Sequence, residues 1–369
     1  MNVLALEPYY DGSHRAFLNG WRDHSRHTWC LNTLPGYKWK WRMRHAALTL
    51  ADQLGADGLK PHAEILVCSD MLNLAEFRGL APAWIQSLPS VVYFHENQLT
   101  YPARCENERD CHFAMTNMTT ALAAQAVWFN SDFHQQTFLA ALAAFLKRMP
   151  DFQSLEAIDR IREKSRVLYP GIPPTEVKSK NNSGPLHILW AARWEHDKNP
   201  EDFFAALDLL RQESDDFLLS VIGQSFQEEP PVFAQARQRF APQIRHWGFQ
   251  ENRTAYEKVL AEADLVVSTA LHEFFGIGMI EAIAAGAYPL LPKRLSYPEI
   301  LRLGEHPGTE AFFYDGSPAE LATTLHAAIK RHRAGNLWQS APSAVDLVKR
   351  FCWSFQAQRL DDALEAVCR

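Results

Sequence analysis

The sequence predicts an α/β protein built from two doubly wound parallel-sheet domains, and three observations support this fold class. Short β-rich runs alternate with longer helical runs along the chain, which is typical of parallel βαβ units. A polar stretch rich in Pro, Gly, Ser and Asn interrupts this alternation near its middle. The 369 residues are enough to bury two hydrophobic cores without help from disulfides or metal.

The first predicted domain covers residues 1–173. We expect its strands at 2–6, 27–33, 63–68, 90–94, 126–129 and 165–168, and its helices near 13–24, 42–54, 72–87, 111–124 and 131–147. Residues 174–185 form the predicted linker, because their composition continues neither element type.

The second predicted domain covers residues 186–349 and repeats the alternation. We expect strands at 186–192, 217–222, 265–268, 288–291 and 311–314, and a final helical segment at about 343–367. The sequence shows no internal repeat and no low-complexity tract.

Composition, charge and cysteine pattern argue against a general polyanion-binding protein, a disulfide scaffold and a membrane-spanning protein. With 37 Lys and Arg against 43 Asp and Glu, the net charge of −6 repels polyanions, so any nucleic-acid site has to be local. The six cysteines are scattered without a CxxC pair, and only Cys105, Cys111 and His112 could form a metal cluster, which we do not favour. No export signal and no apolar run of about 20 residues is visible. We therefore expect a cytoplasmic protein without membrane contact or metal, and the oligomeric state stays open.

Polar residues follow nearly every strand of the first predicted domain. Because ligands of open parallel sheets bind at the carboxyl ends of the strands, these residues predict a polar cleft. They are Glu7, Gly12, Ser13, His14, Ser69, Asp70, His95, Glu96, Asn97, Gln98, Asn130, Ser131 and Asp132. Gly12 and Ser13 open a helix whose amides can approach a phosphate. The alternative is structural: Ser13, Asp70 and Ser131 can cap helices, and His95 can have a structural role only.

Two cations flank a predicted helix start in the second domain. Arg193 leaves the strand at 186–192, Lys198 lies five residues later, and Asn199 then supplies an N-cap before Pro200. This arrangement can hold a diphosphate and neutralise it as it leaves, without a metal. The alternative is a solvated pair of surface charges balanced by nearby acidic residues.

Two glutamates lie eight residues apart in the segment 271–281. Glu273 is expected in a loop and Glu281 in the helix that opens near Gly276, so hydroxyls of one nucleotide sugar could reach both carboxylates. The alternative for Glu281 is a buried helical carboxylate, which then needs a partner.

Cations alternate with large apolar side chains in residues 37–44. In an extended chain, Lys38, Lys40, Arg42 and Arg44 would lie on one side and Tyr37, Trp39, Trp41 and Met43 on the other. Cations for phosphates and aromatic faces for bases are what single-stranded RNA loops require. The alternatives are an amphipathic strand or helix start with its aromatics in the core, or a surface for anionic lipid.

The glutamate pair, followed by the small residues 282–286, resembles the signature of retaining GT-B glycosyltransferases of group four. The resemblance implies two Rossmann-like domains facing a central cleft, with the last helix, about 350–369, packed back on the first domain. It implies that Arg193 and Lys198 contact the donor diphosphate, Glu273 the hexose, Glu281 the ribose and His95 the transferred sugar. Phe274, Phe275 and Gly276 lie in the same signature and are expected at the donor.

Three N-terminal motifs, at residues 7–14, 34–44 and 93–102, are similar to those of the tRNA-queuosine mannosyltransferase family. The resemblance covers residues 1 to about 300, and Asp11 departs from it where a second glycine is expected. It implies GDP-mannose as donor, the queuosine of an aspartate tRNA as acceptor, retention of configuration and no cofactor. The residues expected at the acceptor are His14, Lys38, Trp39, Lys40, Trp41, Arg42, Arg44, Glu96, Asn97 and Gln98.

Three other functions stay open from the sequence. They are a GT-B transferase acting on a lipid or glycan, a GT-B sugar epimerase, and a non-catalytic RNA-binding protein that retains a nucleotide-sugar pocket.

Overall fold

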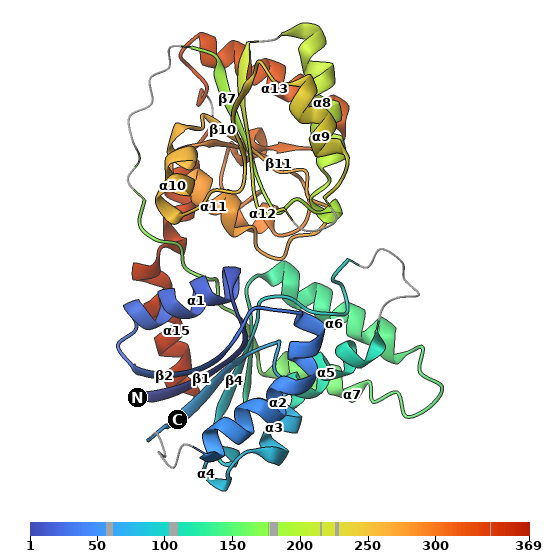
Figure 1. Ribbon diagram of the computed structural model, residues 1–369, viewed down its shortest axis with the longest axis vertical. Helices are drawn as coiled ribbons and strands as arrows, with labels where there is room; N and C mark the ends of the chain where they lie inside the picture. The colour runs from blue at the N-terminus through green and yellow to red at the C-terminus, as the bar shows by residue number, and fades with distance from the viewer. Residues whose placement is uncertain are drawn as a thin grey trace. The chain divides into compact units, whose positions relative to one another are not determined.

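The computed structural model describes residues 1–56, 62–102, 110–175, 177, 184–214, 216–225, 229–339 and 341–369. The chain divides into two compact units, Met1–Pro173 with Phe351–Arg369 and Pro174–Arg350 (Figure 1). Most of the predicted linker lies outside the described residues. In the described part of the chain, no helix is both long and apolar enough to cross a bilayer.

The first unit contains a six-stranded sheet in the order β2-β1-β3-β4-β5-β6, in which all neighbours are parallel. The strands are β1 (Asn2–Tyr10), β2 (Thr28–Pro35), β3 (Ile65–Ser69), β4 (Ser90–Phe94), β5 (Ala126–Phe129) and β6 (Ser165–Val167). All six lie where the sequence predicts them. The strand order reverses between β1 and β3, so a ligand crevice is expected at the carboxyl ends of these two strands.

Helices cover both faces of this sheet. They are α1 (Gly12–His24), α2 (Trp39–Ala56), α3 (Leu74–Leu80), α4 (Ala83–Gln86), α5 (Cys111–Ala123), α6 (Asp132–Leu146), α7 (Glu156–Glu163) and α15 (Trp353–Val367). The core on one face joins Val3, Tyr93 and Trp128 of the strands to side chains of α1 and α15. The residues between them, such as Leu4 and Phe94, pack with the remaining helices, as strand alternation requires.

One helical prediction for this unit is wrong, and another is confirmed with an earlier start. The single helix expected at 72–87 is two helices, because Pro82 holds the preceding residue, Ala81, in an extended conformation. The helix expected at 42–54 begins earlier, at Trp39, so residues 37–44 are not an extended chain. The helix α7 was not predicted.

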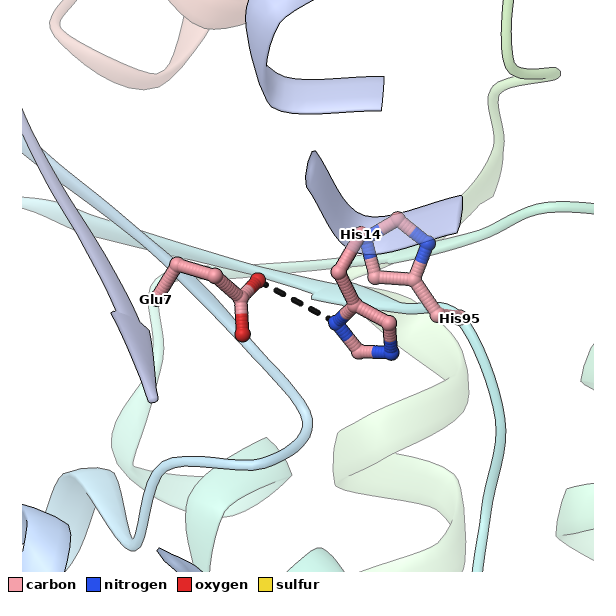
Figure 2. A group of neighbouring side chains, drawn as sticks. All are labelled: Glu7, His14 and His95. Atoms are coloured by element: carbon pink, nitrogen blue, oxygen red, sulfur yellow. Dashed lines mark hydrogen bonds and ion pairs between the residues drawn. The ribbon is translucent and has the colours of Figure 1, made fainter. Parts of the chain in front are cut away.

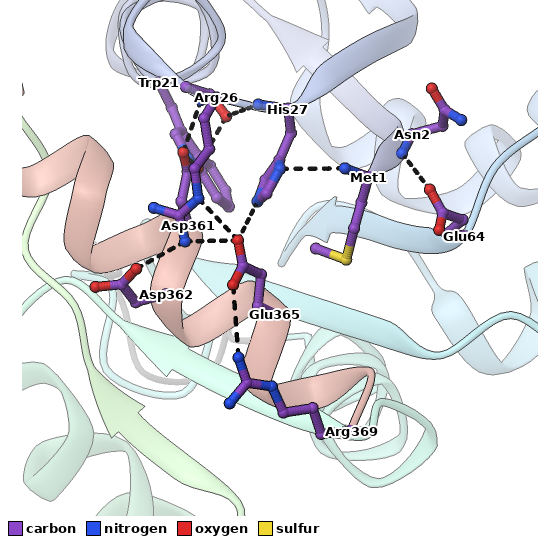
Figure 3. Close-up of polar contacts among 11 residues, drawn as sticks. Met1, Asn2, Trp21, Arg26, His27, Glu64, Asp361, Asp362, Glu365 and Arg369 are labelled. Atoms are coloured by element: carbon purple, nitrogen blue, oxygen red, sulfur yellow. Dashed lines mark hydrogen bonds and ion pairs between the residues drawn. The ribbon is translucent and has the colours of Figure 1, made fainter.

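The last helix, α15, completes the first unit (Figure 3). Ile172 accepts from the amide of Trp353 at 3.0 Å and donates to the carbonyl of Phe351 at 2.8 Å. The indole of Trp21 donates to Asp361 at 2.8 Å. The Trp353 ring fills the space beside Gly20, where an added Cβ would lie 2.2 Å from it. The helix α15 can therefore pack against the first unit because position 20 is a glycine, which leaves room for the Trp353 ring.

The second unit contains a parallel six-stranded sheet in the order β12-β11-β10-β7-β8-β9. Its strands are β7 (Leu186–Ala191), β8 (Phe217–Ile222), β9 (Ile244–Gly248), β10 (Leu265–Val267), β11 (Tyr288–Pro292) and β12 (Phe313–Tyr314). The strand β9 was not predicted, and β12 is shorter than expected because a 3-10 turn, Thr309–Phe312, precedes it. The order reverses between β7 and β10, which marks the expected ligand crevice of this sheet.

The second unit places α8 and α9 on one face of its sheet and α10 and α11 on the other (Figure 1). The helices are η2 (His196–Lys198), α8 (Pro200–Glu213), α9 (Val232–Arg239), α10 (Arg253–Glu262), α11 (Ile277–Ala284), α12 (Tyr297–Ile300), α13 (Pro318–Arg333), α14 (Ala344–Val348) and η4 (Lys349–Phe351). Both sheets therefore confirm the doubly wound α/β prediction.

Candidate functional site

Lys198 connects the loops that follow β7 and β10 in the second unit. Its ammonium donates to the carbonyl of His272 at 2.8 Å and to Glu273 Oε2 at 3.2 Å, and lies 3.1 Å from Asp197 Oδ2. The amide of Leu271 donates to the carbonyl of Asp197 at 2.8 Å. Both predicted groups, the cation and the first glutamate, thus meet at the point where the strand order reverses.

The charge states of this cluster follow from burial and pairing. Burial alone would lower the pKa of Lys198, but the carboxylates of Glu273 and Asp197 outweigh it and raise that pKa. Burial would raise the pKa of Glu273, but Lys198 outweighs it and lowers the pKa. Burial and the Lys198 charge lower the pKa of His272 to about 4. At neutral pH the cluster therefore contains the ammonium of Lys198, the carboxylate of Glu273 and the neutral imidazole of His272.

Arg193 and Asn199 lie at the edges of the same loop. The Arg193 side chain is half-exposed and pairs with Glu195 at 3.3 Å, which is the neighbouring-acid alternative raised from the sequence. Asn199 occupies the N-cap position of α8 in the left-handed conformation, with φ of 51°. Its amide donates to Asp202 at 2.6 Å instead of accepting from the helix, so the predicted capping bond is wrong.

Glu281 is buried in α11 and already has protein partners. Arg253 Nη1 donates to one carboxylate oxygen at 2.8 Å, and the Tyr256 hydroxyl donates to the other at 2.9 Å. The structural alternative for this carboxylate is therefore present, and its contact with a ribose stays a prediction. Arg253 and Tyr256 were not predicted as partners of Glu281, because they precede it by 28 and 25 residues.

The residues between the two glutamates form the turn into α11. Gly276 begins it with φ of 85°, and an added Cβ there would lie 2.9 Å from the Tyr297 ring. The side chains of Phe274 and Phe275 are buried, and the Phe274 ring packs edge-on against His272 at 4.4 Å between centroids. Donor contacts predicted for these two residues would therefore have to use backbone groups.

Glu7, His14 and His95 lie together at the strand ends of the first unit (Figure 2). Glu7 Oε2 pairs with His14 Nδ1 at 3.2 Å, and the His14 and His95 rings are in contact, with centroids 4.1 Å apart and an angle of 38° between their planes. Glu7 Oε1 accepts from the Ser69 hydroxyl at 2.9 Å and from the amide of Tyr9 at 2.8 Å. The sequence predicted the proximity of these strand-end residues.

Burial and charge set the protonation of this cluster. Burial would lower the pKa of His14, but the Glu7 carboxylate outweighs it and raises the pKa to about 9. Burial and the charge on His14 lower the pKa of His95. Burial also raises the pKa of Asp70. The first unit therefore contains a protonated His14 whose ring contacts that of a neutral His95.

The ligand atoms of Glu7, His14 and His95 lie within 4.8 Å of one another, a spacing that a metal ion could use. The Glu7 carboxylate, however, already pairs with Nδ1 of His14, so two of the three groups that would bind the ion are committed to each other. This geometry favours an ion pair over a metal centre. In the other suspected cluster, Cys111 and His112 are exposed, and Cys105 lies outside the described residues.

The loop 95–98 is fixed by its neighbours. Asp70 Oδ1 accepts from the amide of His95 at 2.8 Å, and Asn130 Nδ2 donates to the carbonyl of His95 at 2.9 Å. Asn97 is fully buried, and its oxygen organises the turn that follows, so its side chain has no surface for the predicted acceptor contact. Gln98 is buried too and donates to Glu96 at 2.9 Å.

The start of α1 departs from the expected phosphate loop. Asp11 caps this helix, and its carboxylate accepts from the amide of Gly12 at 2.9 Å, a donor that the predicted phosphate contact would need. An added Cβ at Gly36 would lie 2.3 Å from Asp11 Cβ, so glycine is required there. Ser13 is exposed, whereas His14 is buried.

The segment 37–44 forms the start of α2, so of the alternatives left open by the sequence the helix start describes its backbone. Lys38 has φ of 50°, which ends the extended chain, and the helix then begins at Trp39. Trp39 packs with the buried Met43 and Phe113, while Tyr37 and Trp41 are each 63% exposed. The helix-start alternative placed the apolar side chains of this segment in the core, and this is true of Trp39 and Met43 but not of Tyr37 and Trp41.

The cations of this segment remain at the surface. Lys38 lies 5.5 Å from the Tyr37 ring centre, Lys40 5.6 Å from that of Trp39, and Arg44 4.6 Å from that of Phe113. Arg42 turns back and donates to the carbonyl of Pro35 at 2.8 Å. We call the exposed residues Tyr37, Lys38, Lys40, Trp41 and Arg44 the basic aromatic patch.

Comparisons with known proteins cover both units. The family model described as tRNA-queuosine alpha-mannosyltransferase N-terminal matches residues 2–172, and that of glycosyl transferases group 1 matches residues 173–337. The curated tRNA-queuosine alpha-mannosyltransferase of Drosophila melanogaster is 36% identical over 312 residues, which are 81% of each chain. A glycogen synthase of Mycobacterium tuberculosis is 24% identical over 221 residues, 56% of this chain and 52% of that protein.

Solved structures share the fold. Anabaena HepE in complex with UDP and glucose superposes with a TM-score of 0.69 at 14% identity, covering 99% of this chain and all of that one. Sucrose-phosphate synthase from Thermosynechococcus elongatus gives a TM-score of 0.73 at 13% identity, covering 100% and 99% of the two chains. These likenesses confirm the GT-B fold class expected from the sequence.

Proposed function

Because the chain belongs to the tRNA-queuosine α-mannosyltransferase family, we propose that it transfers mannose from GDP-mannose to the queuosine of an aspartate tRNA. The observation that carries this proposal is the 36% identity with the Drosophila enzyme over 312 residues. The chain is a hexosyltransferase, and the choice of GDP, of mannose and of the individual tRNA is the finer part of the proposal.

Lys198 and Arg193 supply the charge for the donor diphosphate in this proposal. Lys198 is buried at 6% exposure and held at three points, so its ammonium needs no reorganisation when charge develops on the leaving group. Arg193 is half-exposed and pairs with Glu195; when the donor binds, its guanidinium releases Glu195 and binds the diphosphate instead. Glu273, ionised beside Lys198, accepts hydrogen bonds from hexose hydroxyls.

The reaction exchanges one bond at the anomeric carbon for another. The bond from that carbon to the β-phosphate oxygen breaks, and a bond to a hydroxyl oxygen of queuosine forms on the same face. The hydroxyl proton passes to the departing diphosphate, so GDP leaves and configuration is retained. Lys198 and Arg193 stabilise the negative charge on that diphosphate, and His95 contacts the transferred sugar.

The basic aromatic patch is the proposed contact for the RNA. Tyr37 and Trp41 offer exposed rings on which unstacked bases can stack, at about 1–3 kcal/mol per base. Lys38, Lys40 and Arg44 supply local positive charge on a chain whose net charge is −6. Weak binding to unmodified RNA is expected, because most of the surface repels phosphates.

Transfer of radiolabelled mannose from GDP-mannose tests the function directly. The acceptors are the same tRNA with queuosine and with guanosine at that position, together with an anionic lipid extract and a glycan mixture. We expect label only in the queuosine tRNA. Label in lipid or glycan supports the rival transferase, and donor binding without turnover supports a non-catalytic RNA-binding protein. Release of GDP without labelled acceptor, with a changed sugar, supports an epimerase. Each of these results overturns the proposal.

A further inference from the structure

The imidazole of His95 is held by ring packing and not by hydrogen bonds to its nitrogens. Three rings surround it: His14 at 4.1 Å, Tyr93 at 4.8 Å and Phe17 at 4.9 Å between centroids. Within the described part of the chain, neither ring nitrogen of His95 has a hydrogen-bond partner. Asp70 and Asn130 fix its backbone, which leaves the orientation of the ring to its ring neighbours.

Of the three surrounding rings, His14 alone is fixed by a charged side chain. Its Nδ1 lies 3.2 Å from Glu7 Oε2, and Glu7 itself is 3% exposed. The other carboxylate oxygen of Glu7 accepts from Ser69 and from the amide of Tyr9. A continuous series of contacts therefore runs from the end of β3 through Glu7 and His14 to the face of His95.

We propose that Glu7 and His14 are positioning residues for the transfer reaction: Glu7 fixes the imidazole of His14, and His14 fixes the imidazole of His95 through direct contact between the two tilted rings. This inference rests on the proposed function, in which His95 contacts the transferred sugar. Neither Glu7 nor His14 is required to touch the donor. A loosely held His95 would spend less time in the productive orientation, so the rate of transfer falls while donor affinity is largely kept.

A double-mutant cycle of Glu7→Gln and His14→Phe tests this series of contacts. Glutamine keeps the shape of Glu7 and can still accept from Ser69, while phenylalanine keeps a ring against His95 and removes the pairing group. We expect each single variant to lower kcat about tenfold with KM for the donor within about twofold. Because Glu7 acts through His14, the double variant should lose no more than about tenfold to thirtyfold in all, not the product of the two losses.

Asp52→Asn is the matched control, because it also changes a carboxylate to an amide in the first unit, on an exposed position of α2. Melting temperature and slow donor hydrolysis are measured for every variant. Losses that multiply in the double variant, or a lower melting temperature with unchanged kcat of the folded protein, overturn the inference. Should His14→Phe fail to fold, Glu7→Gln decides alone by the same two readouts. Failure of the wild-type protein to label queuosine tRNA would instead refute the proposed function, which separates the two failures.

Discussion

Replacing Lys198 by methionine removes the charge at the centre of the second unit's loop cluster and keeps most of the bulk. The ammonium now serves Asp197, Glu273 and the carbonyl of His272. Without it, the Asp197 carboxylate, whose side chain is 8% exposed, and the Glu273 carboxylate lose the cation that lies within 3.2 Å of both. Loss of one partner from a buried ion pair costs about 3–5 kcal/mol, and the 28% exposure of the Glu273 side chain places the expected loss near the lower end.

The same substitution removes a cation from the proposed leaving diphosphate. Loss of one such preorganised group lowers kcat by about 10²–10³, which is about 2.7–4 kcal/mol of transition-state stabilisation. Denaturant unfolding measures the first effect. Radiolabelled transfer, at a temperature where the variant is folded, measures the second.

The variant Asp197→Asn/Lys198→Met separates the two effects. It removes one carboxylate together with the cation, so most of the lost stability should return while transfer stays about 10²-fold slower. Transfer by Lys198→Met within about twofold of wild type would refute the role given to this ammonium. Recovery of both stability and transfer in the double variant would show that Lys198 serves only the fold.

Three further predictions follow from the same structure. Arg193→Ala should lower kcat/KM about 10²-fold with no change in melting temperature, because this side chain is half-exposed; a parallel fall in both would make it structural. The pKa of His14 is raised from 6.5 to about 9, so the stability that its pair with Glu7 contributes is fully present below about pH 6.5 and is lost as pH rises through about 9. Melting temperatures of wild type and His14→Phe should therefore converge in alkaline buffer, and a constant difference would contradict the pairing. Changing Lys38, Lys40 and Arg44 to glutamine should raise KM for tRNA and spare donor hydrolysis, whereas Arg42→Gln, which loses the bond to Pro35, should mainly lower stability; equal loss of transfer and hydrolysis in the triple variant would assign the patch to folding.

The sequence could predict elements whose burial is uniform. The strands at 90–94 and 126–129 match their expected bounds, because every residue in them is buried and the apolar runs are uninterrupted. The strand β9 was missed because Ile244–Gly248 contains Arg245 and His246 and lies at the sheet edge, half-exposed. Alternation over eight residues at 37–44 could not distinguish a strand from a turn and helix start, and the positive φ of Lys38 decides for the latter.

Part of the candidate site was also predictable from the sequence. Strand-end residues could be placed together because parallel strands end at one edge of their sheet, which explains the meeting of Glu7 with Ser69 and of Lys198 with Glu273. The partners of Glu281 could not be anticipated, since a helix-to-helix contact leaves no periodic mark in the sequence. The helix cap formed by Asp11 was not predicted either, because the family resemblance led us to expect a glycine at that position.

The second unit is, in topological terms, an insertion between Pro173 and Phe351 of the first. The hydrogen bond between Trp21 and Asp361 joins residues 340 positions apart, so the first globule cannot close until nearly the whole polypeptide has been synthesised. During translation the inserted lobe can mature first, while Phe17, Trp21 and Tyr93 still await their cover from α15. A nonsense mutation shortly after residue 350 would therefore damage the N-terminal lobe, although most of that lobe is translated first. A version of this lobe made without the inserted one requires residues 351–369 to be joined directly after residue 173.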